Sequence, residues 1–260
     1  MTLDISSSEH KNGDDITAGN LNAPHNEIVN YINNNIEPAR YIDSNVTKTV
    51  GSGGDFGKLQ DAIDYFGTLI PTKSLIGGII KLKSGFVLDE YIYLKSKQLG
   101  WVNIEAEDPV VYVNPNAAYE TETLGGPPRY QSILVFDSTF PTITFSLEAQ
   151  SHNLSGYRLL TLSDRSTVTI IKNNAVRNNH GQPNNFSIAL FRQSTLFAPA
   201  STFDIITSNE DSYAYLYGAN FERVRVLRFS RADVSDATYN SVNVPLNQIT
   251  PEGIIVDRFA

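Results

Sequence analysis

Residues 50–66 read Val50-Gly-Ser-Gly-Gly-Asp-Phe-Gly-Lys-Leu-Gln-Asp-Ala-Ile-Asp-Tyr-Phe66. The glycines predict a turn that leads into Asp55, whose carboxylate is a good acceptor for the free backbone amides at the start of a helix. Apolar residues then recur at helical spacing, at Leu59, Ala62, Ile63, Phe66 and Ile70. The period changes to two in Gly78-Ile-Ile-Lys-Leu-Lys-Ser-Gly85. The segment therefore predicts a short amphipathic helix, capped by Asp55 and followed by β-structure.

The same residues resemble the entry of pectin-lyase-like right-handed β-helices, which pectinesterases share with the tailspike and tail-fibre proteins of bacteriophages. The resemblance covers residues 46–94, and it consists of Val-Gly-x-Gly-Gly-Asp-Phe-x-x-Leu-Gln-x-Ala-Ile-Asp followed by Ile-Ile-Lys-Leu-Lys-x-Gly. It implies a right-handed parallel β-helix in which the short helix covers the apolar end of the first coil, as the terminal repeat of a solenoid requires. A helix packed on an ordinary β-sandwich is the alternative.

Strand-like runs continue at short intervals from 79–83 to 224–229, and they are rich in Val, Ile, Thr, Tyr and Phe. No helical pattern interrupts them, which excludes an alternating βαβ sheet, and no strict sequence repeat is visible. We expect an arm and a helix at residues 1–46, a β-helix body at 47–231, and a C-terminal segment at 232–260 that covers the last coil. A long loop at 114–129, rich in glycine and proline, is a candidate binding element.

Composition and charge exclude several classes of function. Charged residues make up only 18% of the 260, and the net charge of −8 argues against a nucleic-acid partner, because phosphate binding needs clustered Lys and Arg. The chain has no cysteine, so disulfides and thiolate chemistry are excluded. The N-terminus shows no secretory signal, and no apolar run approaches the roughly 20 residues of a membrane span. We therefore expect no membrane insertion.

A polar helix is predicted at residues 21–37, with a narrow apolar stripe of Leu21, Ile28, Ile32 and Ile36. Such a stripe suits a seam between a few identical helices, and it equally suits a helix docked on its own chain. The wording Ile16-Thr-Ala-Gly-Asn-Leu-Asn-Ala-Pro-His-Asn-x-Ile28 resembles N-terminal segments of phage tail proteins. This second resemblance implies a homotrimer that attaches to other phage tail proteins.

No strong catalytic motif is present. The sequence lacks a Gly-x-Ser-x-Gly elbow, a His-Glu-x-x-His motif and a phosphate-binding loop. The histidines have no metal-ligand spacing, so we expect no metal and no cofactor; they are His10, His25, His152 and His180. Beyond the shared entry, the pectinesterase active-site pattern fails.

Hydrolysis of a glycosidic bond would need two carboxylates about 5 to 10 Å apart. Asp137 with Glu148, or Asp204 with Glu222, are the pairs that neighbouring coils would bring together. Surface carboxylates are common, so we assign no catalytic residue.

Two strand-like runs carry better signals for binding. In Tyr213-Ala-Tyr-Leu-Tyr217, alternation puts Tyr213, Tyr215 and Tyr217 on one face. In Glu222-Arg-Val-Arg-Val-Leu-Arg-Phe229, Arg223 and Arg225 share a face. Aromatic rings stack on sugars and Arg pairs with carboxylates, so an outer wall of these side chains would bind an acidic polysaccharide. A subunit interface is equally rich in Tyr and Arg.

These observations predict a component of a phage tail spike or tail fibre. It would be made in the host cytoplasm, reside in the virion, and bind polysaccharide on the host surface. An enzyme that degrades polysaccharide on the same fold, as a lyase, hydrolase or esterase, is one alternative. A purely structural tail protein is another.

Overall fold

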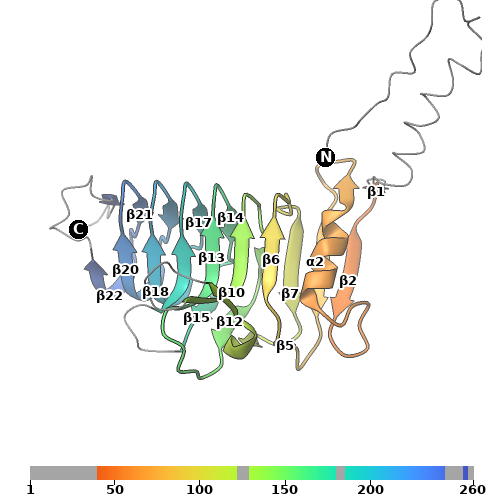
Figure 1. Cartoon of the computed structure of the whole chain (residues 1–260). Helices are drawn as coiled ribbons and strands as arrows, with labels where there is room; N and C mark the ends of the chain where they lie inside the picture. Colours follow the sequence, from red (N-terminus) through yellow and green to blue (C-terminus); the bar gives the residue numbers. More distant parts are fainter. Residues whose placement is uncertain (1–39, 122–128, 180–184, 244–253, 257–260) are drawn as a thin grey trace, which may run out of the picture. The chain divides into compact units, whose positions relative to one another are not determined.

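The computed structural model describes residues 40–121, 129–179, 185–243 and 254–256 (Figure 1). The chain divides into two units, residues 1–40 and 41–260, and nearly all described residues belong to the second. The predicted helix at 21–37, with its stripe of Leu21, Ile28, Ile32 and Ile36, lies outside the described residues. The described part is mainly β, as the sequence predicts, and its three larger sheets are built from parallel ladders.

Two of these sheets succeed one another along the chain. The four-stranded sheet has the order β2 (Val46–Val50), β4 (Gly78–Leu82), β7 (Val102–Ala106) and β11 (Thr142–Ile143). The five-stranded sheet has the order β14 (Thr167–Thr169), β17 (Thr195–Phe197), β19 (Tyr213–Tyr215), β21 (Arg231–Asp233) and β23 (Ile254–Val256). In both sheets the order in space follows the order in sequence, so the chain returns to the same sheet again and again.

The third sheet has twelve strands in two arms that meet on β18 (Thr202–Ser208). One arm is β5 (Val87–Leu88), β8 (Val110–Val113), β12 (Ser146–Ala149) and β15 (Ala175–Arg177). The other is β6 (Ile92–Lys95), β10 (Arg129–Phe136), β13 (Tyr157–Ser163) and β16 (Phe186–Leu190). The sheet continues from β18 through β20 (Asn220–Val226) to β22 (Thr238–Asn243), and Figure 1 shows these strands as a row of arrows pointing the same way.

Five short elements complete the described part. β9 (Tyr119–Thr121) pairs antiparallel with β10, and β1 (Arg40–Ile42) pairs with β3 (Leu69–Pro71). The α-helix is α2 (Leu59–Gly67), and a 3-10 turn, η1 (Pro115–Ala117), follows β8. Apart from β9, the ladders of the twelve-stranded sheet are parallel, which disagrees with the sandwich alternative, because sandwich sheets are antiparallel.

Rows of aligned apolar side chains form the core. One row runs across five strands and is at most 1% exposed at every position, at Ile133, Leu160, Ile188, Ile206 and Val224. Parallel register places each of these side chains directly on its neighbour. Full burial of one such side chain contributes about 1.5–3 kcal/mol, so the stacked rows supply most of the favourable energy of the fold.

A column of buried serines marks one corner of the chain's path, at Ser138, Ser166, Ser194, Ser212 and Ser230. Each hydroxyl after the first accepts a hydrogen bond from the backbone amide of the serine before it, at 3.1–3.3 Å. The intervals are 28, 28, 18 and 18 residues. The two residues before each of the last four serines have positive φ, between 48° and 64°. The repeat is therefore structural, and its changing interval is the reason that no strict repeat is visible in the sequence.

The start of α2 differs from the sequence prediction. The apolar stripe is confirmed, because Leu59, Ala62, Ile63 and Phe66 are buried, but Ile70 lies in β3 and is exposed. Asp55 does not cap the helix, which begins only at Leu59 with Lys58 before it and no capping side chain of its own.

Glu90 takes the place at the start of α2 that the sequence predicted for Asp55, and Asp55 has other partners. Asp55 accepts hydrogen bonds from the amide and the hydroxyl of Thr49, both at 2.8 Å, and these bonds lower its pKa to about 2. Glu90, thirty-one residues beyond the helix start, instead accepts from the amide of Leu59 at 2.7 Å. Burial raises the pKa of Glu90, because the charged form loses hydration.

A candidate anion-binding pocket

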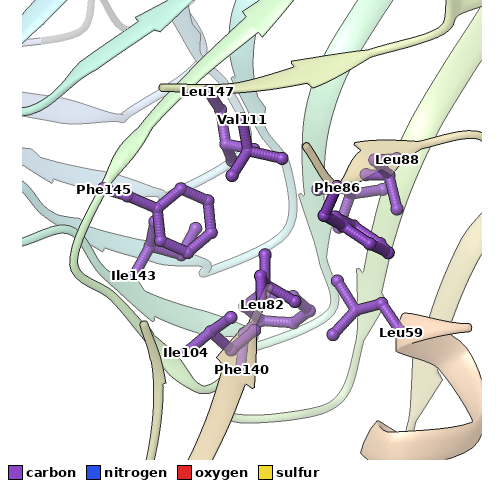
Figure 2. A pocket seen from close by; sticks show the side chains of 11 residues that line it. Leu59, Leu82, Phe86, Leu88, Ile104, Val111, Phe140, Ile143, Phe145 and Leu147 are labelled. Atoms are coloured by element: carbon purple, nitrogen blue, oxygen red, sulfur yellow. The ribbon is translucent and has the colours of Figure 1, made fainter. Parts of the chain in front are cut away.

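An apolar cavity inside the described part of the chain is too small to hold a ligand. Figure 2 shows this space between α2 and the strands, lined by apolar side chains that include Leu59, Phe86 and Phe140. Its volume is about 10 Å³, which is the size of a single water. It has no polar lining group that could bind a water either.

The predicted tyrosines and arginines alternate as expected but lie on different sheets. Ala214 and Leu216 are buried, which leaves Tyr213, Tyr215 and Tyr217 facing outward from β19. Val224 and Val226 are buried in β20, and Arg223 and Arg225 alternate with them. β19 belongs to the five-stranded sheet and β20 to the twelve-stranded sheet. The single outer wall that we expected does not form, because the chain turns a corner at Gly218, where φ is 64°.

The tyrosines form one part of an aromatic stack. The ring centroids of Phe197 and Tyr215 are 4.7 Å apart, and the rings are stacked nearly parallel, with an interplanar angle of 4°. Tyr215 and Tyr217 continue the stack at 6.4 Å. A hydrogen bond to Asp236 raises the pKa of Tyr217. The sequence did not single out Phe197, since it lies eighteen residues before Tyr215 and meets it only through the β17–β19 register.

Arg225 lines a pocket on the twelve-stranded sheet. The pocket has a volume of about 370 Å³ and is formed by β10, β13, β16, β18 and β20 together with adjacent loop residues. Its described lining residues are Arg129, Ser155, Gly156, Arg158, Phe186, Phe191, Thr207, Asn209, Arg225 and Leu227. They include three arginines and no carboxylate.

Arg158 is held over an aromatic ring in this pocket. Its guanidinium carbon lies 4.9 Å from the ring centroid of Phe191, which is within the range of a cation–π contact. Its Nε is buried and makes no hydrogen bond to any described residue. Burial lowers the pKa of Arg158 to about 10, with a smaller contribution from the positive charge of Arg129. The side chain therefore stays charged at neutral pH while lacking an anionic partner in the described part of the chain.

Arg225 repeats this arrangement three strands away, on β20. Its guanidinium carbon lies 5.9 Å from the ring centroid of Phe186. The register explains why the two arginines converge, because Arg225 faces Thr207 on β18, and Thr207 faces Ala189 on β16, between Phe186 and Phe191. Two guanidinium groups over two phenyl rings thus line one recess.

The sequence analysis found Arg225 but missed Arg158, Phe186 and Phe191. Arg158 precedes the run of apolar residues that indicated a strand, and Phe186 follows an Asn-rich turn. The available signal was an arginine near the start of a strand, but this position does not indicate which distant strand lies beside it.

The arrangement is suited to an oxyanion. A guanidinium group donates two parallel hydrogen bonds to a carboxylate, and such charge-assisted bonds are about twice as strong as neutral ones. A buried donor without an acceptor costs about 1–3 kcal/mol, so an anion that reaches the Nε of Arg158 would recover part of that cost. The phenyl rings supply apolar faces for the carbon skeleton that carries the anion.

Of the two candidate carboxylate pairs, one lies at strands of different arms of the twelve-stranded sheet, and the other lies on neighbouring strands. Asp137 pairs with Arg165 at the serine corner, whereas Glu148 lies in β12 beside Arg177. Asp204 does lie across from Glu222, between two registered pairs of β18 and β20. Oδ2 of Asp204, however, accepts from the backbone amides of Asn178 at 2.8 Å and of Asn179 at 3.3 Å, so the group stabilises a turn.

Within the described ranges, no group of three or more His, Asp or Glu side chains is placed to hold a metal ion. No described helix has the length and apolar character needed to cross a membrane. Comparison with models of protein families gives no match, and comparison with curated proteins gives none at the threshold of significance.

Proposed function

We propose that the chain is a right-handed, pectin-lyase-like parallel β-helix that serves as a component of a phage tail spike or tail fibre and binds an acidic polysaccharide of the host surface. The fold proposal rests on the parallel ladders, in which the chain returns to each sheet at intervals such as 28 and 18 residues. Handedness follows from the strong preference for right-handed connections between parallel strands of one sheet. The helix α2, whose apolar face packs at the entry, suits the cap of such a solenoid.

The observation that carries the binding function is that Arg158 and Arg225 have no acidic partner in the described part of the chain. The protein has a net charge of −8, so its acidic side chains outnumber its basic ones. The pocket nevertheless presents Arg129, Arg158 and Arg225 with no carboxylate among its described lining residues. A uronic acid or another acidic sugar matches both parts of this lining, because it combines a carboxylate with an apolar ring face.

The placement in a virion rests on the resemblance of residues 16–28 and 46–94 to phage tail proteins. In this proposal the N-terminal helix joins three copies and attaches them to other tail proteins, and the chain is made in the host cytoplasm. Light scattering on the full chain and on a chain beginning at Thr47 tests this part. A mass of three copies that falls to one on truncation supports it, and one copy in both cases contradicts it.

The binding proposal is tested with a matched pair of ligands. A panel of acidic capsular polysaccharides is measured by calorimetry against the full chain, each next to its carboxyl-reduced form, in which carboxylates are converted to alcohols. We expect binding of at least one acidic form and loss of binding on reduction. Equal binding of both forms would rule out recognition of the acid, and release of reducing ends or unsaturated products would favour the enzyme alternative.

A further inference from the structure

A group of stacked aromatic side chains lies at the β6 end of the arm that contains β13 and β16. The ring of Tyr91 is 6.2 Å from that of Tyr93, with an interplanar angle of 11°, and 5.2 Å from that of Tyr119. Tyr93 is 40% exposed and Tyr119 is 54% exposed, so two of the three rings present a large area to solvent. We call Tyr91, Tyr93 and Tyr119 the tyrosine platform.

The register connects this platform to the pocket. Tyr93 lies between the buried Ile92 and Leu94, and Arg225 lies between the buried Val224 and Val226, so both side chains face outward. They are the two ends of a single row of registered residues, which consists of Tyr93, Leu134, Thr161, Ala189, Thr207 and Arg225. Neighbouring strands are about 4.8 Å apart, so the five steps of this row span about 24 Å.

The part of the surface nearest the platform suits the same kind of ligand, whereas Thr161, Ala189 and Thr207 in the middle of the row are buried. Leu134 and Phe136 are partly exposed on β10, and the Lys95 ammonium lies 5.8 Å from the ring centroid of Phe136. Arg158, the nearer of the two unpaired arginines, is on β13, two strands or about 10 Å from the strand of Tyr93. A cation over an aromatic ring thus occurs between the platform and the pocket as well as inside the pocket.

We infer that the ligand is an extended glycan chain that lies across the strands, with an acidic residue held by Arg158 and Arg225 and a neutral sugar ring on the tyrosine platform. The inference rests on the proposed binding function and adds the length and direction of the ligand to it. Linking two weak contacts in one chain makes the second contact intramolecular, which raises affinity by about 10²-fold or more without any new contact.

The experiment compares ligands of two lengths on one protein. The probes are glucuronic acid and a hyaluronan octasaccharide, in which glucuronate alternates with a neutral N-acetyl sugar, and both are titrated into the full chain by calorimetry. We expect the octasaccharide to bind about 10²-fold more tightly than the monosaccharide. The substitution Tyr93→Ala should lower octasaccharide affinity about tenfold and leave glucuronic acid affinity unchanged.

A further variant serves as the matched control. Tyr112→Ala removes a tyrosine of similar exposure, 48%, from β8 on the other arm, and it should change neither affinity. Tyr93→Ala should not disturb folding, because the hydrogen bonds between Gln60 and Tyr93 involve only the backbone amide and carbonyl of Tyr93, at 2.8 and 3.2 Å.

Equal affinity for the two probes, or equal effects of Tyr93→Ala and Tyr112→Ala, would overturn the extended ligand while leaving the pocket intact. Failure of both probes to bind, together with failure of the polysaccharide panel, would overturn the proposed function itself and the inference with it.

Discussion

Arginines occur in two regions of this molecule in opposite states. Along the serine corner, Arg165, Arg192 and Arg228 pair with acids that lie 28 or 18 residues earlier in the chain, at 2.8–3.2 Å, and their side chains are 61–71% exposed. In the pocket, Arg158 and Arg225 are more buried and have no acidic partner among the described residues. The exposed arginines of the corner therefore have acidic partners, whereas the more buried arginines of the pocket have none among the described residues. The difference indicates that the corner arginines serve the surface of the fold, and that the pocket arginines serve a ligand.

The largest expected effect comes from neutralising the pocket. The double substitution Arg158→Gln and Arg225→Gln should weaken binding of the acidic polysaccharide by about 10²-fold, because two charge-assisted contacts are lost. Urea unfolding should change by no more than about 1 kcal/mol, because no ion pair within the protein is broken. The matched control is Arg165→Gln with Arg192→Gln, which removes the same charge from the corner. Equal loss of binding in both double variants would show that only net charge matters.

The next effect lies under the corner. Ser194→Ala removes a hydroxyl that accepts from the amide of Ser166 and donates to the carbonyl of Phe191 at 2.6 Å. Both partners are then left buried and unsatisfied, so we expect a loss of about 2 kcal/mol in the free energy of unfolding, measured in urea. If Ser194→Ala costs no more than a surface substitution, the serine column does not hold the corner together.

A smaller effect is expected from the corner arginines themselves. Arg192 pairs with Asp164 and Glu210, but exposed ion pairs contribute only about 0–1 kcal/mol each. Arg192→Gln should therefore reduce the free energy of unfolding by less than about 1 kcal/mol, and the reduction should shrink further in 1 M salt. A loss as large as that of Ser194→Ala would reverse the ranking of serine and arginine at this corner.

The smallest effect on stability is expected for Asp55, a carboxylate that is held by hydrogen bonds. Its pKa is lowered to about 2 by hydrogen bonds from Thr49 and Lys48, so its contribution to stability is complete above its ordinary value of 3.8 and is lost as pH falls toward 2. Removing this charge with Asp55→Asn should lower the melting temperature at pH 6 by about 1–2 °C and have no effect at pH 2. Melting curves recorded by circular dichroism at the two pH values provide the test, and an equal shift at both would assign the effect to shape and not to charge.

Local patterns predicted which side chains point inward. The period of 3.6 placed Leu59, Ile63 and Phe66 on the buried face of α2, and the period of two placed Ala214 and Val224 inside their strands. These predictions succeeded because orientation depends on neighbours in sequence.

Predictions that joined distant segments were less successful. Asp55 was assigned to cap a helix that Glu90 caps instead, and the tyrosines and arginines of residues 213–225 were assigned to one wall that a corner divides in two. The pocket residues Arg158 and Phe186 carried no distinctive signal, since neither has a partner near it in sequence.

The sequence by itself therefore determined a mainly β chain with a short amphipathic helix, and it determined the inward and outward faces of its strands. Only the tertiary structure decided which charges meet, which aromatic rings stack, and where two arginines are left without an acid. The physical reason is the offset between stacked strands. It is 28 residues at one step and 18 at the next, and it depends on the length of every intervening loop. Contacts across such offsets arise only when the chain has folded, and the proposed site consists of those contacts.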